Sequence, residues 1–180
     1  LSRIPAEHAA KLPLQAAVED DFKVAKPALW QIINGQWRYE NGLLRQSEAG
    51  AERRVLQLKA TAPTDFDATL SFTIRGGQKW KSVGLVFDMD GQSNALVYMS
   101  ATNSGPKLQL ALTKDGKTSY PPAAAVARKI LPDTRYSLNL KLRGLLLNVS
   151  IDGSLVMSYR LEGGRKAGGM AIAAFDADAE

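Results

Sequence analysis

The sequence predicts an all-β protein built as a sandwich of two antiparallel sheets, on three observations. After residue 20, apolar and polar residues alternate in about a dozen short segments, and a period of two indicates strands with one buried face. Turn residues, glycine above all, separate these segments at intervals of about 8–12 residues, as in sandwiches and barrels. Segments 83–87 and 170–175 are apolar on both faces, as central strands are, which favours two stacked sheets over one exposed sheet.

The predicted strands follow one another along the chain without a long helical segment between them. Residues 30–45 are expected to hold three short strands, joined by turns at Asn34-Gly35 and Asn41-Gly42. Further strands are expected at residues 55–60, 66–76, 81–90, 94–101 and 107–113, and another at 168–176. Residues 1–19 are Ala-rich and are expected to form a short N-terminal arm or linker, which leaves 20–180 as the β-sandwich domain.

Residues 135–161 (RYSLNLKLRGLLLNVSIDGSLVMSYRL) predict a three-stranded antiparallel meander. Arg143-Gly144 and Asp152-Gly153 separate three alternating runs, and Asp-Gly suits a tight hairpin because glycine tolerates a positive φ. The side chains that share the apolar phase, and are therefore expected to face the core, are Tyr136, Leu138, Leu140, Leu142, Leu145, Leu147, Val149, Ile151, Leu155, Met157, Tyr159 and Leu161.

The composition excludes several kinds of chemistry. The 180 residues include no cysteine, which excludes disulfides and thiolate metal sites, and the one histidine, His8, lies in the predicted arm. Ser-His-Asp relays and multi-histidine zinc sites therefore find no imidazole in the folded domain. The net charge is +5, but the basic residues fall mostly in turns and on polar strand faces. That distribution predicts a solvated surface and no nucleic-acid partner.

The ends and the hydropathy of the chain set expectations about its context. No run approaches the roughly 18 apolar residues that a transmembrane helix needs, so we expect no membrane insertion. The first residues contain neither an initiator methionine nor an apolar signal core, and we therefore expect a segment of a longer protein.

Several turn and core positions resemble those of a known superfamily. Asp21-Phe22, Trp30, Gly35-Gln36-Trp37 and the hairpin at 41–44 resemble the opening of concanavalin A-like lectin and glucanase jelly rolls of the laminin G-like kind. The nearest members are the 3-keto-disaccharide hydrolase-type domains and related sugar-binding modules of environmental bacteria. The resemblance continues through 81–101, 135–156 and 168–180. It implies a concanavalin A-like jelly-roll sandwich over residues 20–180, but structural positions specify a fold better than a function.

The sequence disfavours one enzymatic activity of this superfamily. Jelly-roll glycosidases of the laminarinase type carry Glu-x-Asp-x-x-Glu on one strand, which brings nucleophile, helper and acid into the cleft. This chain lacks the motif, and no predicted strand presents two glutamates. A non-catalytic function is therefore favoured over retaining glycoside hydrolysis.

An aromatic residue in a charged loop is the best candidate for a ligand contact. Trp80 lies in the segment GGQKWK at 76–81, whereas Trp30 and Trp37 follow the strand rhythm and are assigned to the core. Exposed large aromatic residues often mark interaction sites, and sugars stack their apolar faces on such rings. The expected ligand-binding residues are Trp80 for stacking and, for sugar hydroxyls, Arg75, Asp88, Asn94 and Tyr98. A core position for Trp80 is the alternative.

The turn at 88–94 (DMDGQSN) is rich in oxygen-bearing side chains. Asp88 and Asp90 are candidate ligands for Ca²⁺, which takes six to eight oxygen atoms. The alternative, an ordinary hairpin loop that uses Asp, Gly and Asn for their turn conformations, is favoured because the spacing does not match an EF-hand loop.

The preferred hypothesis is a non-catalytic carbohydrate-binding module of a larger exported bacterial protein, located outside the cell or in the periplasm. Its partners would be a poly- or oligosaccharide and the other domains of the parent chain. Two alternatives stay open. One is a sugar hydrolase of the 3-keto-disaccharide type that uses Asp88 or Asp90 as acid or base. The other is a structural or protein-interaction module of the laminin G-like kind.

Overall fold

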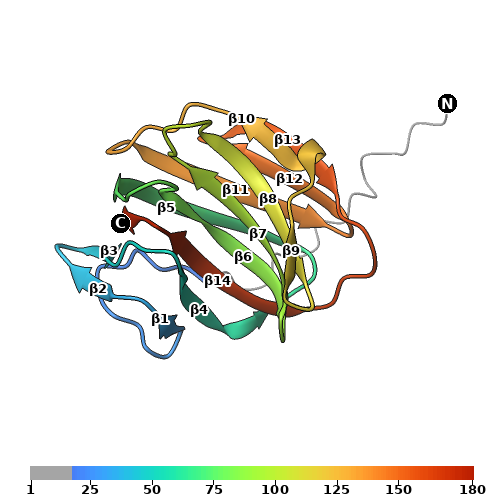
Figure 1. Cartoon of the computed structure of the whole chain (residues 1–180). Helices are drawn as coiled ribbons and strands as arrows, with labels where there is room; N and C mark the ends of the chain where they lie inside the picture. The colour runs from blue at the N-terminus through green and yellow to red at the C-terminus, as the bar shows by residue number, and fades with distance from the viewer. Residues whose placement is uncertain (1–17) are drawn as a thin grey trace.

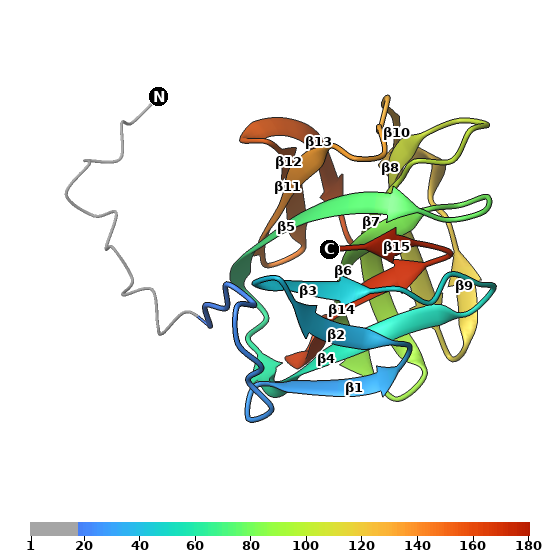
Figure 2. The same ribbon diagram turned by 90° about the vertical axis from the view of Figure 1, so that its left-hand side faces the viewer.

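Two antiparallel sheets lie face to face in the computed structural model, which describes residues 18–180 (Figures 1 and 2). One sheet has eight strands, in the order β1-β4-β14-β6-β7-β8-β10 with β9 added to β8, and the other has seven, in the order β13-β12-β11-β5-β15-β3-β2. The predicted all-β sandwich is therefore confirmed. Residues 1–17, most of the expected N-terminal arm, lie outside the described residues together with His8.

The strand bounds agree closely with the alternating segments of the sequence. The eight-stranded sheet contains β1 (Trp30–Asn34), β4 (Arg53–Ala62), β14 (Gly168–Phe175), β6 (Ser82–Asp90), β7 (Ser93–Ser100), β8 (Lys107–Lys114), β9 (Lys117–Ser119) and β10 (Ala125–Ala127). The seven-stranded sheet contains β13 (Ser154–Arg160), β12 (Leu146–Ile151), β11 (Arg135–Arg143), β5 (Phe66–Gly76), β15 (Asp178–Ala179), β3 (Leu43–Gln46) and β2 (Trp37–Glu40). The short strands β9, β10 and β15 were not predicted from the sequence.

Neighbouring strands in these sheets often come from distant parts of the chain. The dark red strand β14 lies between the teal strand β4 and the green strand β6, so an early and a late segment pair directly (Figure 1). In the other sheet, β15 near the C-terminus lies between β5 and β3. Among residues 18–180, no helix has the length and apolar character needed to span a membrane.

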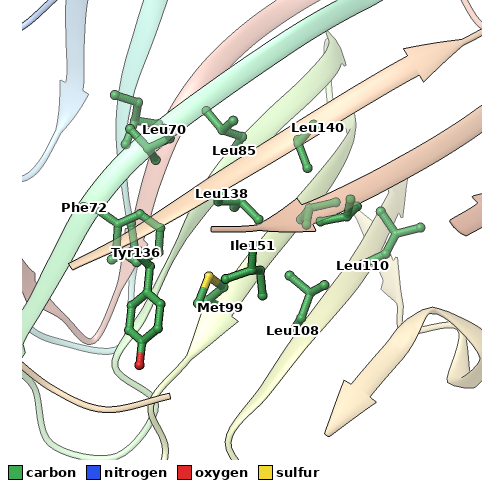
Figure 3. Close-up of a cluster of buried hydrophobic side chains, with 14 of the residues drawn as sticks. Leu70, Phe72, Leu85, Met99, Leu108, Leu110, Tyr136, Leu138, Leu140 and Ile151 are labelled. Carbon is green, nitrogen blue, oxygen red and sulfur yellow. The ribbon is translucent and has the colours of Figure 1, made fainter. Parts of the chain in front are cut away.

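The core fills the space between the two sheets (Figure 3). The seven-stranded sheet contributes fully buried leucines of β11, Leu138 and Leu140, while the eight-stranded sheet contributes Leu108 and Leu110 of β8. The further side chains labelled in this cluster are Leu70, Phe72, Leu85, Met99, Tyr136 and Ile151. Burying such side chains contributes roughly 1.5–3 kcal/mol each, so the stacked arrangement follows from the alternating pattern itself.

The predicted meander is confirmed. Strand β11 pairs with β12 and β12 with β13, all antiparallel, and the turn residues Gly144, Asp152 and Gly153 have positive φ. Its predicted core residues of β11 and β12 are buried from Tyr136 to Ile151, apart from the half-buried Leu145.

The prediction is wrong for one residue of the meander, Leu155, which was expected in the core. Leu155 is 63% exposed, because the register of β12 against β13 shifts next to Val149. Val149 opposes Met157, but the next residue, Ser150, opposes Leu155, so Val156 is the extra residue. An extra residue changes the phase of a strand, and Leu155 consequently shares the outward face of Ser150.

The assignment of Trp30 and Trp37 to the core is confirmed. Both rings are half-buried and pack against the main core cluster. The Trp30 indole N–H donates to Asp20 at 2.8 Å, and the Trp37 indole N–H donates to the Asn34 carbonyl at 2.9 Å. Each tryptophan therefore buries its apolar body while its polar group keeps a partner.

Candidate functional site

The outer face of the eight-stranded sheet carries ordered rows of side chains, because paired residues on adjacent strands point to the same side. One row runs across β4, β14, β6, β7 and β8 as Arg53, Phe175, Ser82, Ser100 and Lys107. The next row is Val55, Ala173, Gly84, Tyr98 and Gln109, and a third is Gln57, Ala171, Val86, Leu96 and Ala111. These rows face away from the main core, and their apolar members form a second, separate cluster.

This face is hollowed into a groove of about 670 Å³. The lining residues are Arg53, Trp80, Ser82, Leu96, Tyr98, Ser100, Lys107, Gln109, Ala111, Tyr120, Ala173, Ala174 and Phe175. The groove combines an apolar floor, several aromatic rings and a few polar groups, which is the usual composition of a site for a small ligand.

Only small side chains project into the middle of the groove. Ala173 and Gly84 lie side by side in the same row as Tyr98. Gly84 has a packing reason as well, since a Cβ atom at this position would lie 2.0 Å from the Val97 carbonyl oxygen and 2.9 Å from the Tyr98 Cβ. The absence of a side chain at Gly84 therefore lets β7 and Tyr98 approach β6 closely.

A buried carboxylate fixes the loop that carries Trp80. The carboxylate of Asp176 accepts hydrogen bonds from the backbone N–H groups of Gln78 at 3.1 Å, Lys79 at 2.6 Å and Trp80 at 2.8 Å. Burial alone raises the pKa of Asp176, but the three N–H groups and the charge of Lys81 outweigh it, and the pKa lies below its usual value. The ionised form therefore holds the loop in place at neutral pH.

The same loop is fixed from the other side by two serines of the groove. The hydroxyls of Ser82 and Ser100 both donate to the carbonyl oxygen of Trp80, the former at 3.2 Å. The Trp80 side chain is 41% exposed at the rim, and the ammonium group of Lys79 lies 4.8 Å from its ring centroid. The backbone of Trp80 is thus held by several hydrogen bonds, while its ring is accessible at the rim and has a cation close to its π-system.

A tyrosine and a glutamine form a polar pair in the groove. The Tyr98 hydroxyl donates to Gln109 Oε1 at 3.1 Å, which leaves the Gln109 amide N–H groups and the Tyr98 oxygen able to bond a ligand. Burial, reinforced by the nearby Tyr120, raises the pKa of Tyr98 to about 12, while Arg53 acts in the opposite direction. Tyr98 is therefore a neutral hydroxyl at physiological pH.

Arg53 reaches from β4 across the groove to β7. Its Nη1 donates to Asn94 Oδ1 at 3.3 Å, although two strands, β14 and β6, lie between β4 and β7. Burial lowers the pKa of Arg53, whereas its proximity to Tyr120 and Tyr98 raises it. An arginine stays charged in proteins, so the groove contains a permanent, half-buried positive charge.

The five predicted ligand-binding residues do not form one site. Trp80 and Tyr98 both line the groove, and Asn94 joins them through its hydrogen bond to Arg53. Arg75 lies on β5 of the other sheet, where it forms ion pairs with Asp133 and Glu180. Asp88 is engaged by Arg165, whose Nε and Nη2 each donate to one carboxylate oxygen at 2.7 Å. Arg75 and Asp88 therefore do not line the groove with Trp80. Arg75 belongs to the other sheet, and Asp88 lies where the pairing of β6 with β7 becomes irregular, at the end of β6 away from Ser82.

The arrangement around Asp88 gives no support to the calcium hypothesis. Both Asp88 oxygens accept hydrogen bonds from Arg165, so a Ca²⁺ ion at Asp88 and Asp90 would compete with a guanidinium already in place. Within residues 18–180, no group of three or more His, Cys, Asp or Glu side chains is arranged to hold a metal ion.

Sequence reasoning missed most of the groove residues, Arg53, Gln109 and Tyr120 among them. Alternation in β4 and β8 does place Arg53 and Gln109 in the phase opposite to the core leucines, which is a usable signal. What the sequence does not show is that β4 and β8 belong to one sheet with β14, β6 and β7 between them. Tyr120 follows β9, a strand too short to be recognised by its pattern.

A second hollow, of about 460 Å³, contains carboxylates but is a weaker candidate. Its acidic lining residues are Asp20, Asp21 and Glu180. Each one is already paired with a cation: Asp20 with Lys26 at 3.0 Å, Asp21 with Lys23 at 3.0 Å, and Glu180 with Arg75. Carboxylates that already have a cationic partner are less available to a ligand, and the groove on the eight-stranded sheet is the better candidate site.

Comparison with known proteins supports the fold. No protein-family model and no curated protein matches the sequence. The carbohydrate-binding module CBM66 from Bacillus subtilis matches in structure with a TM-score of 0.72 and 20% identity, over 83% of this chain and 89% of that one. A β-glucanase from Bacillus licheniformis matches with a TM-score of 0.67 and 10% identity, over 87% and 83% of the two chains.

A Bacillus subtilis protein of unknown function with a galectin-like fold is also similar, with a TM-score of 0.67 and 15% identity, over 88% of this chain and 90% of that one. Identities this low establish the fold alone. They confirm the expected jelly-roll sandwich of two antiparallel sheets, while the resemblance to the concanavalin A-like superfamily, and within it to laminin G-like and 3-keto-disaccharide hydrolase-type domains, stays a prediction.

Proposed function

We propose that this chain is a non-catalytic carbohydrate-binding module that holds a poly- or oligosaccharide in the groove of the eight-stranded sheet. One observation carries the proposal. Trp80, Tyr98 and Tyr120 surround a floor of small residues, and serine, glutamine and basic side chains line the same groove. Sugars need this combination, because their C–H faces stack on aromatic rings while their hydroxyls require hydrogen-bond partners.

The polar groups of the groove suit hydroxyl recognition. The hydroxyl hydrogens of Ser82 and Ser100 are used by the Trp80 carbonyl, so their oxygen atoms accept from sugar hydroxyls. The Gln109 amide and the Lys107 ammonium supply donors. A site whose polar groups are positioned before the ligand arrives loses little entropy on binding.

The lining of the groove argues against glycoside hydrolysis there. Canonical glycosidases place two carboxyl groups roughly 5–9.5 Å apart on either side of the scissile bond. Among the described residues, those that line the groove include neither aspartate nor glutamate. Asp88, the candidate acid or base of the hydrolase alternative, is held by Arg165 outside that lining.

The similar structures support a carbohydrate-related function. One is a carbohydrate-binding module, while others are a β-glucanase and a xylan β-1,4-xylosidase from Bacillus halodurans that is longer than this chain. We further propose that the module belongs to a larger exported bacterial protein, outside the cell or in the periplasm. In that setting it would keep the other domains of the parent chain close to a glycan.

A binding experiment tests the proposal. A glycan array followed by isothermal titration calorimetry, with sugars up to the millimolar range, is expected to identify at least one bound saccharide. The variant Trp80→Ala should weaken that binding at least about tenfold, since single aromatic anchors dominate such sites. Leu155→Ala is the matched control, because Leu155 is an exposed apolar residue on the other sheet, and it should bind like the wild type.

Two results would replace the proposal with one of its alternatives. Release of reducing ends from keto-disaccharides or polysaccharides by the wild type would favour a sugar hydrolase. Absence of binding to every saccharide, together with equal behaviour of the wild type and Trp80→Ala, would favour a structural or protein-interaction module of the laminin G-like kind.

A further inference from the structure

The charged residues of the groove are all cations. Arg53 and Lys107 stand at the two ends of one cross-strand row, and both are half-buried. Among residues 18–180, neither of them forms an ion pair. Half-buried charges in folded proteins are usually paired, so a groove with two cations and no acidic lining residue is complementary to a negatively charged ligand.

Arg53 has unused hydrogen-bonding capacity inside the groove. A guanidinium carries five N–H donors in a planar fork, and within the described part of the chain the Arg53 side chain makes one hydrogen bond, the 3.3 Å contact to Asn94. Other arginines of this chain are used differently. Arg165 gives two N–H groups to Asp88 and others to the carbonyl oxygens of Thr64 and Gly144.

The position of the Arg53 guanidinium also concerns the sugar site directly. Its hydrogen bond to Asn94 brings it to β7, the strand of Tyr98, and both Arg53 and Tyr98 line the groove with Tyr120. The unused N–H groups of the guanidinium therefore share the groove with the rings on which a saccharide would stack. A carboxylate matches the fork of an arginine with two parallel hydrogen bonds, which a hydroxyl does not.

We propose that the saccharide bound in the groove is acidic, and that the carboxylate of a uronic acid residue pairs with Arg53 while Lys107 adds a second positive charge. This inference rests on the proposed saccharide-binding function and adds the chemical class of the ligand. Its physical basis is that the ligand supplies the counter-ion that the protein does not place beside Arg53.

Matched pairs of glycans test the inference by titration calorimetry. The probes are oligogalacturonate, alginate oligosaccharides and glucuronoxylan fragments, each compared with its carboxyl-reduced, neutral counterpart. For at least one pair, the acidic form should bind at least about tenfold more tightly at low salt, and the difference should shrink as ionic strength rises. The variant Arg53→Gln should remove most of this preference, because it weakens the acidic form far more than the neutral form, which loses only a hydrogen-bond donor.

A matched arginine and a sulfated probe complete the experiment. Arg38→Gln removes an exposed arginine of β2 in the other sheet and should leave the preference unchanged, apart from the small effect of net charge. Equal or tighter binding of the neutral forms, or an equal loss for both forms in Arg53→Gln, would overturn the inference and leave the saccharide-binding proposal intact. A preference for sulfated glycans over carboxylated ones would overturn the assignment to a carboxylate. No binding by any glycan, acidic or neutral, would overturn both proposals.

Discussion

At the scale of single residues, Asp176 shows how one side chain can build a binding surface without touching a ligand. Its carboxylate gathers three consecutive backbone N–H groups of the loop 78–80, and the loop then presents Trp80 at the rim of the groove. The backbone of Asp176 itself has a φ of 49°, a conformation that aspartate and asparagine tolerate better than most residues. The position of Trp80 thus depends on the negative charge of Asp176, which binds the backbone of its loop.

Replacement of Asp176 by asparagine should therefore weaken both the fold and saccharide binding. Asparagine keeps the backbone conformation but loses the charge-assisted hydrogen bonds, and we expect the free energy of unfolding to fall by about 1–3 kcal/mol. Urea denaturation of the wild type and of Asp176→Asn measures this difference. Asp115→Asn is the control. Asp115 has a similar positive φ of 48°, so the substitution is subject to the same backbone conformation, but Asp115 lies on an exposed turn. An equal effect of the two substitutions would contradict this role of Asp176.

The pH dependence of this contribution has a defined sign. The pKa of Asp176 is lowered in the folded protein from an ordinary value of 3.8. A lowered pKa stabilises the fold fully above the unfolded-state pKa, and the contribution disappears as the pH falls through the folded-state value. The stability difference between the wild type and Asp176→Asn should accordingly be constant near neutral pH and shrink below about pH 4. A difference that grows on acidification would contradict this assignment.

At the scale of elements, the close contact of β6 with β7 depends on a glycine. A methyl group at Gly84 would meet the Val97 carbonyl oxygen of β7 at 2.0 Å, and backbone atoms cannot yield as a flexible side chain does. The same contact determines where Tyr98 lies across the groove. The shape of the site is therefore coupled to the pairing of two central strands.

Gly84→Ala should destabilise the protein by about 1–3 kcal/mol or more, because over-packing forces the strands to shift. It should also weaken saccharide binding, since Tyr98 moves with β7. Thermal unfolding and calorimetric titration measure the two effects. Gly164→Ala is the control, because a Cβ atom there meets nothing within 4 Å, and it should change stability very little. A stable Gly84→Ala variant with unchanged binding would show that the contact is not required.

The phase change in β13 gives a second prediction at the scale of elements. Because the register shift turns Leu155 outward, Leu155→Lys should change the free energy of unfolding by less than about 0.5 kcal/mol. Met157, two residues later, is buried, and Met157→Ala should cost about 2–5 kcal/mol. Chemical denaturation of the two variants distinguishes this register from an uninterrupted alternation, in which both substitutions would be strongly destabilising.

At the scale of the whole molecule, one arginine connects the two sheets at an end of the sandwich. Arg165 pairs with Asp88 on β6, and it donates to the carbonyl oxygens of Thr64, between β4 and β5, and Gly144, between β11 and β12. Its side chain is 7% exposed. This buried arginine therefore links three segments that are not joined to one another by the hydrogen bonds of a sheet.

Arg165→Gln should reduce the free energy of unfolding by about 3 kcal/mol, because it leaves the Asp88 carboxylate and two carbonyl oxygens without their partner. Chemical denaturation measures the loss, and the double variant Arg165→Gln with Asp88→Asn should recover part of it. Arg75→Gln is the control, because the Arg75 ion pairs are exposed and its effect should be smaller. Equal losses in the two arginine variants would show that burial does not set the strength of these contacts.

Much of the fold was predictable from the sequence because its signals are local. Alternation and turn residues gave most strands within a few residues, the meander at 135–161, and the core positions of Leu138 and Leu140. The exception, Leu155, depends on how β13 pairs with β12, and a single strand does not encode its own bulge. Trp80 was also recognisable, because a tryptophan between two lysines, shortly after Gly76-Gly77, does not fit the rhythm of a strand.

The sequence by itself determined most of the strands and their buried faces, and it made Trp80 the best candidate for an exposed aromatic residue, since each follows from the chemistry of neighbouring residues. Only the tertiary structure decided which outward-facing side chains share a site. Arg53 lies beside Phe175, and both lie in one row with Lys107, because β14 inserts between β4 and β6. The same sheet order places Arg75 in the other sheet, whereas Asp88 shares β6 with Ser82 but lies beyond the groove, where the pairing with β7 is irregular. Strand order depends on contacts between distant parts of the chain, and local periodicity carries no information about it.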